Sequence, residues 1–449
     1  MIPLRLSELV RRSAPRYTSY PTAAQFEPGV GPELYEDWLR SLAGRAASAS
    51  LYLHVPFCRS ICHYCACSTR ATRRDEPILS FADRLRREIE MVAERTGPLH
   101  VGHIHWGGGT PNLLPPDVFD VLVGDLCARF DIAADAEHAV ELDPRLVTRD
   151  GARRLKASGV TRASLGVQDF DESVQRAIGR EQPFSVVRDA VSALCAAGVA
   201  RFNFDLIYGL PRQTMASIRE TARLAASLGP DRIALFGYAH VPWFRANQRL
   251  IDEAALPAPS ERLDLAETAR ETLQAAGYAP VGIDHFARPA EALPQAAREG
   301  RLRRNFQGYT TDRADALIGF GASAIGRLPG GFAQNAPDAA GWARAIDAGR
   351  FATARGRVLT PDDRLRGDVI EGLMCAFEVD LEEIAHAHGR EPSVFAADLA
   401  KLRPLVEQEF LRVEGWRVEI TRDAPILARI VASAFDAYLG AGARHSLAV

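Results

Sequence analysis

Short runs rich in β-branched and apolar residues alternate with longer amphipathic segments from residue 50 onward. The strand-like runs lie at 50–55, 102–107, 138–143, 162–167, 201–209 and 231–240. Between most of them, apolar residues recur at helical spacing. A repeated strand–helix–strand order predicts a parallel sheet with helices outside it. Because chemically active residue types follow several successive strands, the pattern favours a barrel or partial barrel over a dinucleotide-binding sheet.

Individual helices can also be predicted from this pattern. In the segment 78–96, one apolar face is expected to contain Leu79, Leu85, Ile89 and Val92. The segments 184–198 and 214–229 both end in glycine, the residue that most often terminates a helix. Ser260 is expected to cap a helix within 259–278.

Three regions differ in their pattern. Residues 1–46 form a basic, aromatic-bearing N-terminal arm, and residues 47–364 carry the strand–helix repeats. Residues 365–449 are mostly helical in pattern, with a short strand-like stretch at 410–423. We therefore expect an α/β catalytic domain of the partial-barrel type with an arm before it and a small, mostly helical C-terminal domain after it.

Composition narrows the possible functions. The chain has 449 residues, 47% hydrophobic content, a net charge of -3 and a pI near 6.4, which argues against a general nucleic-acid or membrane-surface binder. No apolar run has the length of a membrane span, and no signal-peptide core is present, so a cytoplasmic location is expected. Thiols stay reduced there, and the scattered Cys127, Cys195 and Cys375 are expected to be inert core residues.

The other four cysteines form a cluster, with the spacing C-x3-C-x2-C-x-C, directly after the strand-like "LYLHVP". They are Cys58, Cys62, Cys65 and Cys67. Three thiolates on one loop can hold three irons of a [4Fe–4S] cluster and leave one iron open, for example to the amino and carboxylate groups of S-adenosylmethionine. A zinc site that includes His63, or a redox pair of Cys62 and Cys65, are the alternatives.

Further candidate residues follow successive strands. The stretch "HWGGGTP" has three glycines, whose backbone N–H groups can approach an anionic ligand closely. Glu141, Gln168 and Asp205 each end a later strand, and parallel strands bring their ends to one edge. The stretch "GFGASAIG" at 319–326 has Ala324 in place of the third glycine of a dinucleotide motif, so we interpret it as a strand and turn near the cofactor.

The cysteine spacing, with Tyr64 just before the third cysteine, resembles the radical S-adenosylmethionine superfamily. Ten stretches in order, among them "RYTSYPT", "HWGGGTP", "VELDPR", "SLGVQDF" and "NFDLIYGLP", resemble the oxygen-independent coproporphyrinogen III oxidase family over nearly the whole chain. This resemblance implies that Cys58, Cys62 and Cys65 bind the cluster and that Cys67 does not.

The resemblance also implies two bound S-adenosylmethionine molecules. The cluster-bound molecule would contact Tyr52, Gly108, Glu141 and Ile325. The second would contact Tyr64, Gly109, Thr110, Gln168, Arg180, Asp205 and Ala239. The implied reaction belongs to haem biosynthesis: a 5′-deoxyadenosyl radical takes a hydrogen from a propionate β-carbon of coproporphyrinogen III. Loss of CO2 and one electron then leaves a vinyl group, and two such events give protoporphyrinogen IX.

The resemblance also suggests an electron donor such as a flavodoxin-type reductant, and a monomer. Because the substrate carries four carboxylates, cationic anchors are expected, and the candidates by charge are Arg11, Arg12, Arg16, Arg301, Arg303 and Arg304. His63 and Ala66 depart from the residues common in the family, which puts fine positioning near the second cofactor in question. A haem-trafficking relative and a porphyrin-modifying methyltransferase are the alternative functions.

Overall fold

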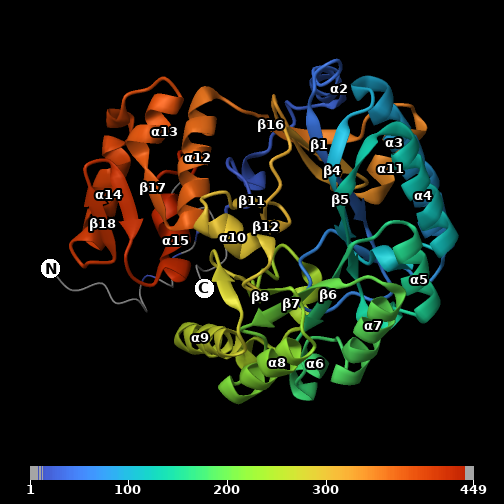
Figure 1. Cartoon of the computed structure of the whole chain (residues 1–449), viewed down its shortest axis with the longest axis horizontal. Coiled ribbons are helices and arrows are strands. Elements are labelled where there is room, and N and C mark those ends of the chain that lie inside the picture. The colour runs from blue at the N-terminus through green and yellow to red at the C-terminus, as the bar shows by residue number, and fades with distance from the viewer. Residues whose placement is uncertain (1–8, 10–11, 13, 440–449) are drawn as a thin grey trace.

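The centre of the molecule is a run of six parallel strands that lie side by side in sequence order, as the alternating pattern predicts (Figure 1). The computed structural model describes residue 9, residue 12 and residues 14–439. The six strands are β1 (Ser48–Val55), β4 (His100–Gly108), β5 (Asp131–Leu142), β6 (Arg162–Gln168), β7 (Arg201–Tyr208) and β8 (Arg232–Gly237). Their carboxyl ends therefore meet at one edge of the sheet.

Helices cover the outer face of these strands (Figure 1). They are α3 (Glu76–Thr96), α4 (Pro116–Arg129), α5 (Arg149–Ala157), α6 (Glu172–Ala177), α7 (Phe184–Ala197), α8 (Met215–Ser227) and α9 (Pro259–Ala275). Leucine, valine and isoleucine side chains from the helices and from the outward-facing strand positions form one continuous core.

Two details of the helix predictions were wrong. Leu79 is 42% exposed, because the buried stripe of α3 starts at Ile78 and continues from there at helical spacing. Ser260 is not a cap, because α9 already begins at Pro259, a residue whose fixed φ suits the first helical position. The glycine prediction is confirmed at α7, where Gly198 has a φ of 90° directly after the helix.

Six further strands extend the sheet at both edges, and apart from the expected strand and turn at 319–326 the sequence pattern did not predict them. At one edge, β13 (Ala316–Phe320) pairs in parallel with β1 and is followed by antiparallel β14 (Ile325–Leu328), β15 (Gly331–Asn335) and β16 (Thr353–Val358). At the other edge, β10 (His285–Ala287) and β9 (Ala279–Val281) are antiparallel to β8 and to each other. The outermost strands β16 and β9 do not pair with one another, so the barrel is open.

The inner face of the barrel is polar. Along β1, Leu51 lies in the core under the helices, whereas the Ser50 hydroxyl donates a hydrogen bond to Asp312 Oδ2 at 2.5 Å. On the inner face of β6, Arg162 Nε is 3.0 Å from Glu137 Oε2. The strand side chains opposite the helices therefore line the barrel with charged and hydroxyl groups.

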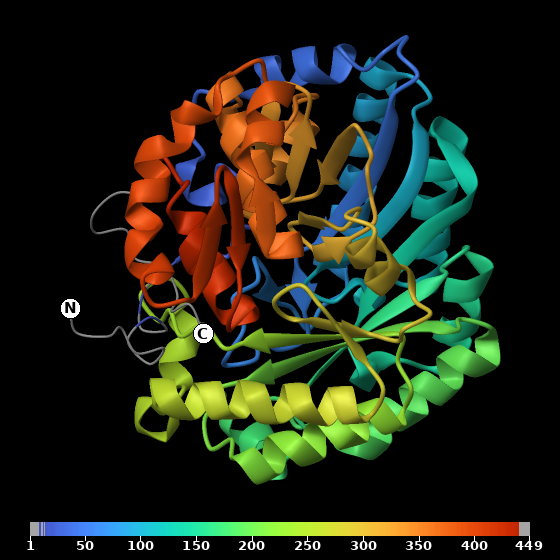
Figure 2. The same cartoon turned by 60° about the vertical axis from the view of Figure 1, so that its left-hand side comes forward.

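The C-terminal region forms its own core beside the open barrel (Figure 2). It contains α12 (Pro361–Ala376), α13 (Leu381–Ala387), α14 (Ala396–Val406) and α15 (Ala424–Ser433). The expected strand-like stretch forms β18 (Leu411–Glu414) and β19 (Arg417–Ile420), and β17 (Glu378–Asp380) pairs with β19.

The N-terminal arm contacts both cores. Its helix α2 (Pro32–Arg40) buries Leu39 against the barrel core. Tyr17 and Tyr20 lie in the C-terminal core, and the Tyr17 hydroxyl donates a hydrogen bond to Asp436 Oδ2 at 3.0 Å. The arm therefore connects the barrel to the C-terminal region.

The scattered cysteines do not all lie in the core. Cys375 is buried as expected, but Cys127 and Cys195 are exposed. Each of these two cysteines directly follows a buried leucine, Leu126 or Leu194. Successive side chains in a helix point about 100° apart, so each cysteine is turned away from the core that its leucine enters. Among the residues that the structure describes, no helix combines the length and apolar character needed to cross a membrane.

Candidate active site

The cysteine loop lies directly after β1, at the carboxyl edge of the parallel strands. Its base is closed by pairing of β2 (Phe57–Cys58) with β3 (Arg70–Ala71), and it contains the free thiols of Cys58, Cys62, Cys65 and Cys67. Each of the three predicted ligands has a hydrogen-bond donor near its sulfur: Thr110 Oγ1 at 3.3 Å from Cys58, Arg180 Nη1 at 3.6 Å from Cys62 and the Cys67 backbone N–H at 3.4 Å from Cys65. Each of these donors can therefore stabilise negative charge on the sulfur beside it.

The thiol environments suit metal ligation. Hydrogen bonds from the Cys67 side chain and backbone lower the pKa of Cys65 to about 7, which favours the thiolate, the form that binds metals. Burial raises the pKa of Cys58, although Thr110 and Thr69 oppose that shift. Within the described part of the chain, no three Cys, His, Asp or Glu side chains converge on a position for a single ion. A [4Fe–4S] cluster needs no such convergence, because each thiolate binds a different iron, so these three cysteines fit it.

Two amide side chains that the sequence did not indicate hold the cysteine loop through its backbone carbonyls. Asn247 Nδ2 is within hydrogen-bond distance of three loop carbonyls, those of Cys62 (3.1 Å), His63 (3.1 Å) and Cys65 (2.9 Å). Gln248, which is fully buried, donates to the Tyr64 carbonyl at 2.8 Å and the Ala239 carbonyl at 3.1 Å. No pattern in the sequence around these two residues indicated this contact, because both lie in a short 3-10 helix, η4 (Ala246–Leu250), that is far from the loop in the chain.

A first group of predicted residues surrounds the end of β1. The Tyr52 hydroxyl is 3.0 Å from His54 Nδ1, and Glu141 Oε1 is 3.0 Å from His105 Nε2. Burial alone would raise the pKa of Glu141, but hydrogen bonds from His105 and from the Gly108 N–H lower it below its ordinary value. Glu141 is therefore an ionised acceptor at neutral pH.

Gly108 and Ile325 complete this group. Gly108 has a φ of 102°, and a Cβ there would lie 2.5 Å from the His54 ring, so the position requires glycine. Tyr52 lies opposite Gly319 in the sheet, and Gly319 lies directly against the Ile325 backbone. The expected strand and turn at 319–326 thus brings Ile325 beside Tyr52.

A second group lies at the ends of β6 and β7. Arg180 Nη2 donates to the Gly166 carbonyl at 2.9 Å, and Gly166 is opposite Asp205 in the sheet. Gln168 has a φ of 67°, an uncommon value for a side chain of this size, and its amide lies against Gly166. Burial and the negative charge of Glu141 raise the pKa of Asp205 to about 7.

The remaining members of the second group are joined to the cysteine loop. The Thr110 backbone N–H donates to the Phe57 carbonyl at 2.7 Å, and a Cβ on Gly109 would lie 2.4 Å from the same oxygen. Tyr64 and Ala239 are held together by their shared hydrogen-bond donor Gln248. All the predicted site residues therefore gather at the carboxyl edge of the strands.

His63 has a structural role in this arrangement. Its backbone N–H donates to the Ile178 carbonyl at 2.9 Å, and its Nδ1 is 3.3 Å from the Ala177 carbonyl. Its ring lies against Gly179, where a Cβ would come within 2.7 Å. His63 thus fixes the cysteine loop to the end of α6, and Ala66 is exposed to solvent.

The structure separates the arginines considered as substrate anchors. Arg11 lies outside the described residues, and Arg12 is exposed. Arg301 pairs with Glu299, and Arg303 Nη1 is 2.9 Å from Glu371 Oε2. Arg16 and Arg304 line the same cavity, next to the ends of β7 and β8.

A cysteine loop that fits a [4Fe–4S] cluster, at the carboxyl edge of an open parallel barrel, defines a radical S-adenosylmethionine protein. The family model for the Radical SAM superfamily matches residues 52–225, and that for the HemN C-terminal domain matches residues 359–424. The chain is 49% identical over 437 residues to an oxygen-independent coproporphyrinogen III oxidase from Bradyrhizobium diazoefficiens, covering 97% of both chains. It is 38% identical to the protein of that name from Escherichia coli K12, covering 98% of this chain and 96% of the relative.

A solved structure leads to the same assignment. The coproporphyrinogen III oxidase (HemN) from Escherichia coli, described as a radical SAM enzyme, superposes with a TM-score of 0.90 at 38% identity, covering 94% of this chain and 98% of that one. The chain belongs to the oxygen-independent coproporphyrinogen III oxidase family. The fold class expected from the sequence is thereby confirmed.

Proposed function

We propose that this protein converts two propionate side chains of coproporphyrinogen III to vinyl groups without oxygen and so forms protoporphyrinogen IX. The observation that carries the proposal is the cysteine loop at the barrel edge, in a chain 49% identical over almost its full length to a coproporphyrinogen III oxidase. When bound, the cluster and S-adenosylmethionine supply an electron and a 5′-deoxyadenosyl radical that removes a hydrogen from the propionate β-carbon. The residues of the chain bind and orient these partners.

Cys58, Cys62 and Cys65 are the proposed cluster ligands. Three protein thiolates leave one iron for the amino and carboxylate groups of S-adenosylmethionine. Cys67 is not a ligand in this proposal: its backbone N–H supports the Cys65 sulfur at 3.4 Å. Hydrogen bonds to the sulfurs raise the reduction potential of such clusters, so the donors Thr110 and Arg180 favour acceptance of an electron.

The first S-adenosylmethionine is proposed to lie against Tyr52, Gly108, Glu141 and Ile325. Glu141 is ionised and lies within the barrel, so it can accept hydrogen bonds from an ammonium group or from ribose hydroxyls. Gly108 leaves the backbone open to a ligand.

The second S-adenosylmethionine is proposed to contact Tyr64, Gly109, Thr110, Gln168, Arg180, Asp205 and Ala239. Arg180 keeps its charge because Tyr64, Asp143 and Cys62 oppose the effect of burial on its pKa, and a guanidinium suits a carboxylate. Asp205 has a pKa of about 7 and can therefore hold or release a proton near the reacting groups at neutral pH.

Several properties outside the reaction centre are also proposals. We propose that the protein is a cytoplasmic monomer and that a flavodoxin-type protein supplies its electrons. We also propose that the chain is divided into an arm (1–46), a catalytic domain (47–364) and a C-terminal domain (365–449). Size-exclusion chromatography tests the monomer, and limited proteolysis tests the division. Reduction of the bound cluster by a purified flavodoxin and its reductase tests the donor.

An anaerobic assay tests the activity. The cluster is reconstituted, and reductant, S-adenosylmethionine and coproporphyrinogen III are added. Protoporphyrinogen IX and 5′-deoxyadenosine are expected together. Formation of 5′-deoxyadenosine without a vinyl product would contradict the substrate assignment, and a methylated porphyrin or tight haem binding without turnover would favour the methyltransferase or haem-trafficking alternative. Zinc in place of about four irons per chain would contradict the cofactor assignment.

A further inference from the structure

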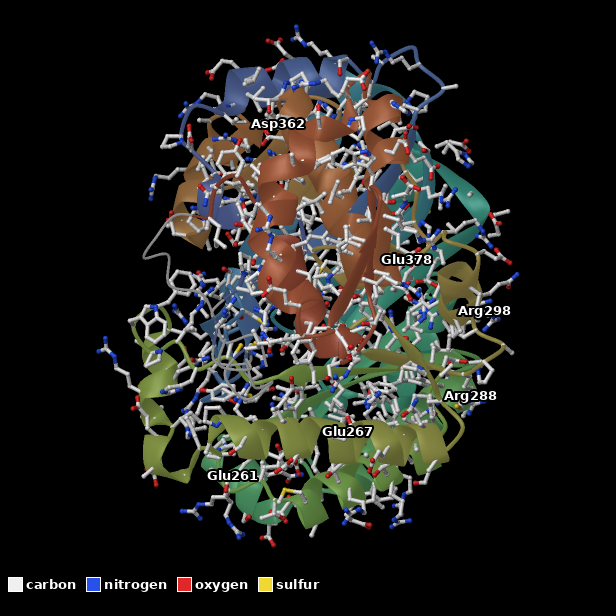
Figure 3. All side chains as sticks on the ribbon, turned by 90° about the vertical axis from the view of Figure 1, so that its left-hand side faces the viewer. Glu261, Glu267, Arg288, Arg298, Asp362 and Glu378 are labelled. Carbon is white, nitrogen blue, oxygen red and sulfur yellow. The ribbon has the colours of Figure 1, made fainter. Side chains whose placement is uncertain are left out.

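A cavity of about 250 Å3 lies beside the reaction centre, between the ends of β7 and β8, helix α9, the N-terminal arm and helix α15. Tyr208 and Gly237 form its wall on the barrel side. Figure 3 views this side of the molecule: α9, marked by Glu261 and Glu267, runs beneath the C-terminal elements. One water needs only about 10–15 Å3, so the cavity has room for a ligand side chain.

Five of the described arginines line this cavity, and besides Arg270 at the surface they come from four separate parts of the chain: Arg16 of the arm, Arg262 of α9, Arg304 of β11 (Arg303–Asn305) and Arg429 of α15. Among the described lining residues, three carboxylates face them, and two of these lie at the rim. Glu267 pairs with the lining residue Arg270 at 2.6 Å on the surface, Asp423 is exposed, and Asp284 is the inner carboxylate. The inner cavity therefore has an excess of positive charge.

The polypeptide holds three of these side chains in place through backbone carbonyls. Arg16 Nη2 donates to the Gly237 carbonyl at 2.9 Å, and Arg262 Nη2 donates to the Tyr238 carbonyl at 2.8 Å. Arg429 Nε donates to the Pro15 carbonyl at 2.9 Å and so holds the arm beside the cavity. Neutral carbonyls fix the direction of a guanidinium but leave its charge in place.

Arg304 is held differently. Its side chain is only 4% exposed, and its Nη2 is 3.4 Å from Asp284 Oδ2. Its guanidinium also lies 4.5 Å from the centre of the Tyr309 ring. Its Nε and Nη1 are buried without a hydrogen-bond partner. Burial, together with the like charges of Arg16 and Arg304, lowers the pKa of Arg429 to about 10, although Tyr208 and Asp284 oppose the shift.

One chain segment joins the wall of the cavity to the cysteine loop. Gly237 and Tyr238 line the cavity, and the carbonyl of the next residue, Ala239, accepts the hydrogen bond from Gln248 that also holds Tyr64. An extended chain advances about 3.3 Å per residue, so the wall of the cavity at Tyr238 is one residue away from the contact that Ala239 makes with the cysteine loop through Gln248. A ligand in the cavity therefore lies close to that loop.

We propose that this cavity binds a carboxylate of a propionate that does not react, and so positions the substrate for reaction at another propionate. The inference rests on the proposed function, because coproporphyrinogen III carries four propionates and only two are converted. A fixed anchor outside the barrel would determine which side chain reaches the cofactors. Arg16 and Arg304 are the anchoring residues chosen for the test, because Arg429 also joins α15 to the arm, whereas Arg16→Lys keeps a donor for the Gly237 carbonyl.

Binding of coproporphyrin III, the fluorescent oxidised tetracarboxylate, to the full-length protein tests this without turnover. The loss of one charge-assisted hydrogen bond is expected to weaken binding by about 10- to 100-fold in Arg16→Gln. Arg16→Lys should restore most of the affinity, and the tetramethyl ester should bind the wild type no better than coproporphyrin III binds Arg16→Gln. Arg223→Gln removes the same charge from the exposed face of α8, where Arg223 pairs with Glu220, and should leave binding unchanged.

Arg304→Gln provides a second test, because Arg16 lies in the arm and its substitution could act on the arm alone. Denaturation curves establish that each variant is folded before it is titrated. In the anaerobic assay, both variants should raise KM by about the same factor with a smaller change in kcat. Equal affinity of the wild type, Arg16→Gln and Arg304→Gln, or tight binding of the ester, would overturn the inference. Absence of vinyl product from the wild type would instead contradict the proposed function, and the titration would still decide the role of the cavity.

Discussion

Asn247 provides a direct test of how the protein holds its cysteine loop. Its Nδ2 has two N–H groups that serve three carbonyls, those of Cys62, His63 and Cys65, at 2.9–3.1 Å. A hydrogen bond contributes a net stabilisation of about 0.5–1.5 kcal/mol. Loss of both N–H groups in Asn247→Ala should therefore lower the free energy of opening the loop by about 1–3 kcal/mol. Loop openings should therefore become about 5- to 150-fold more frequent.

The assay is anaerobic loss of iron to a chelator, followed with hydrogen exchange of the amides of residues 62–67. Iron loss from Asn247→Ala should be faster by up to the same factor, and Asn247→Asp should lose iron faster still, because a carboxylate would face the carbonyl oxygens. Gln408→Ala is the matched control: it removes an exposed amide that donates to the Pro404 carbonyl at 3.0 Å, far from the loop in the chain. Iron loss and exchange in Asn247→Ala equal to those of wild type and control would refute the reasoning.

Three further substitutions test the site and its surroundings. Gly108→Ala should lower the denaturant midpoint of the cluster-free protein, because a φ of 102° alone costs a residue with a side chain about 1–3 kcal/mol and the new Cβ would meet His54. Thr110→Val removes the donor 3.3 Å from Cys58 Sγ, and a redox titration should give a more negative cluster potential. Burial lowers the pKa of His138 to about 4, so stability should fall as pH decreases from about 6.5 towards 4, by up to about 3 kcal/mol; unfolding curves of His138→Asn should lack this slope.

The outcomes of these measurements separate the explanations. An unchanged midpoint in Gly108→Ala would mean that the backbone there adapts. An unchanged potential in Thr110→Val would mean that the hydroxyl does not act on the sulfur. A wild-type slope in His138→Asn would assign the pH dependence to other groups.

The sequence was sufficient to predict the six parallel strands and the gathering of the strand-end residues, because both follow from local patterns. Period-2 and helical spacing define each element, and parallel strands necessarily bring residues such as Glu141 and Asp205 to the same edge. Apart from the expected strand and turn at 319–326, the strands at both sheet edges were missed because short runs, such as the three residues Ala279–Val281, have too little periodicity. Leu79 was misplaced for a related reason, since neighbouring apolar residues define a helix face only to within one position.

Contacts between segments that are distant in the chain could not be predicted from local sequence patterns. Asn247 meets the cysteine loop across more than 180 residues of chain, and Arg429 meets Pro15 across more than 410. Neither contact leaves a signal in a single sequence, because amides and arginines are ordinary surface residues. The charge of Arg16 and Arg304 was noted from the sequence, but only the fold places them in one cavity with Arg262 and Arg429.

The open barrel explains why the arm and the C-terminal region are needed at the site. In a closed barrel of eight strands the interior is just wide enough for side chains to fill it, whereas here the edge strands β16 and β9 do not pair with each other and the inner face carries polar residues. An opening of this kind leaves the parallel strands without a wall on that side. The arm and α15 supply that wall, and Arg429 fixes one to the other through Pro15. If Arg16 anchors a substrate carboxylate, the same contact that joins the arm to the C-terminal region also sets the position of the substrate.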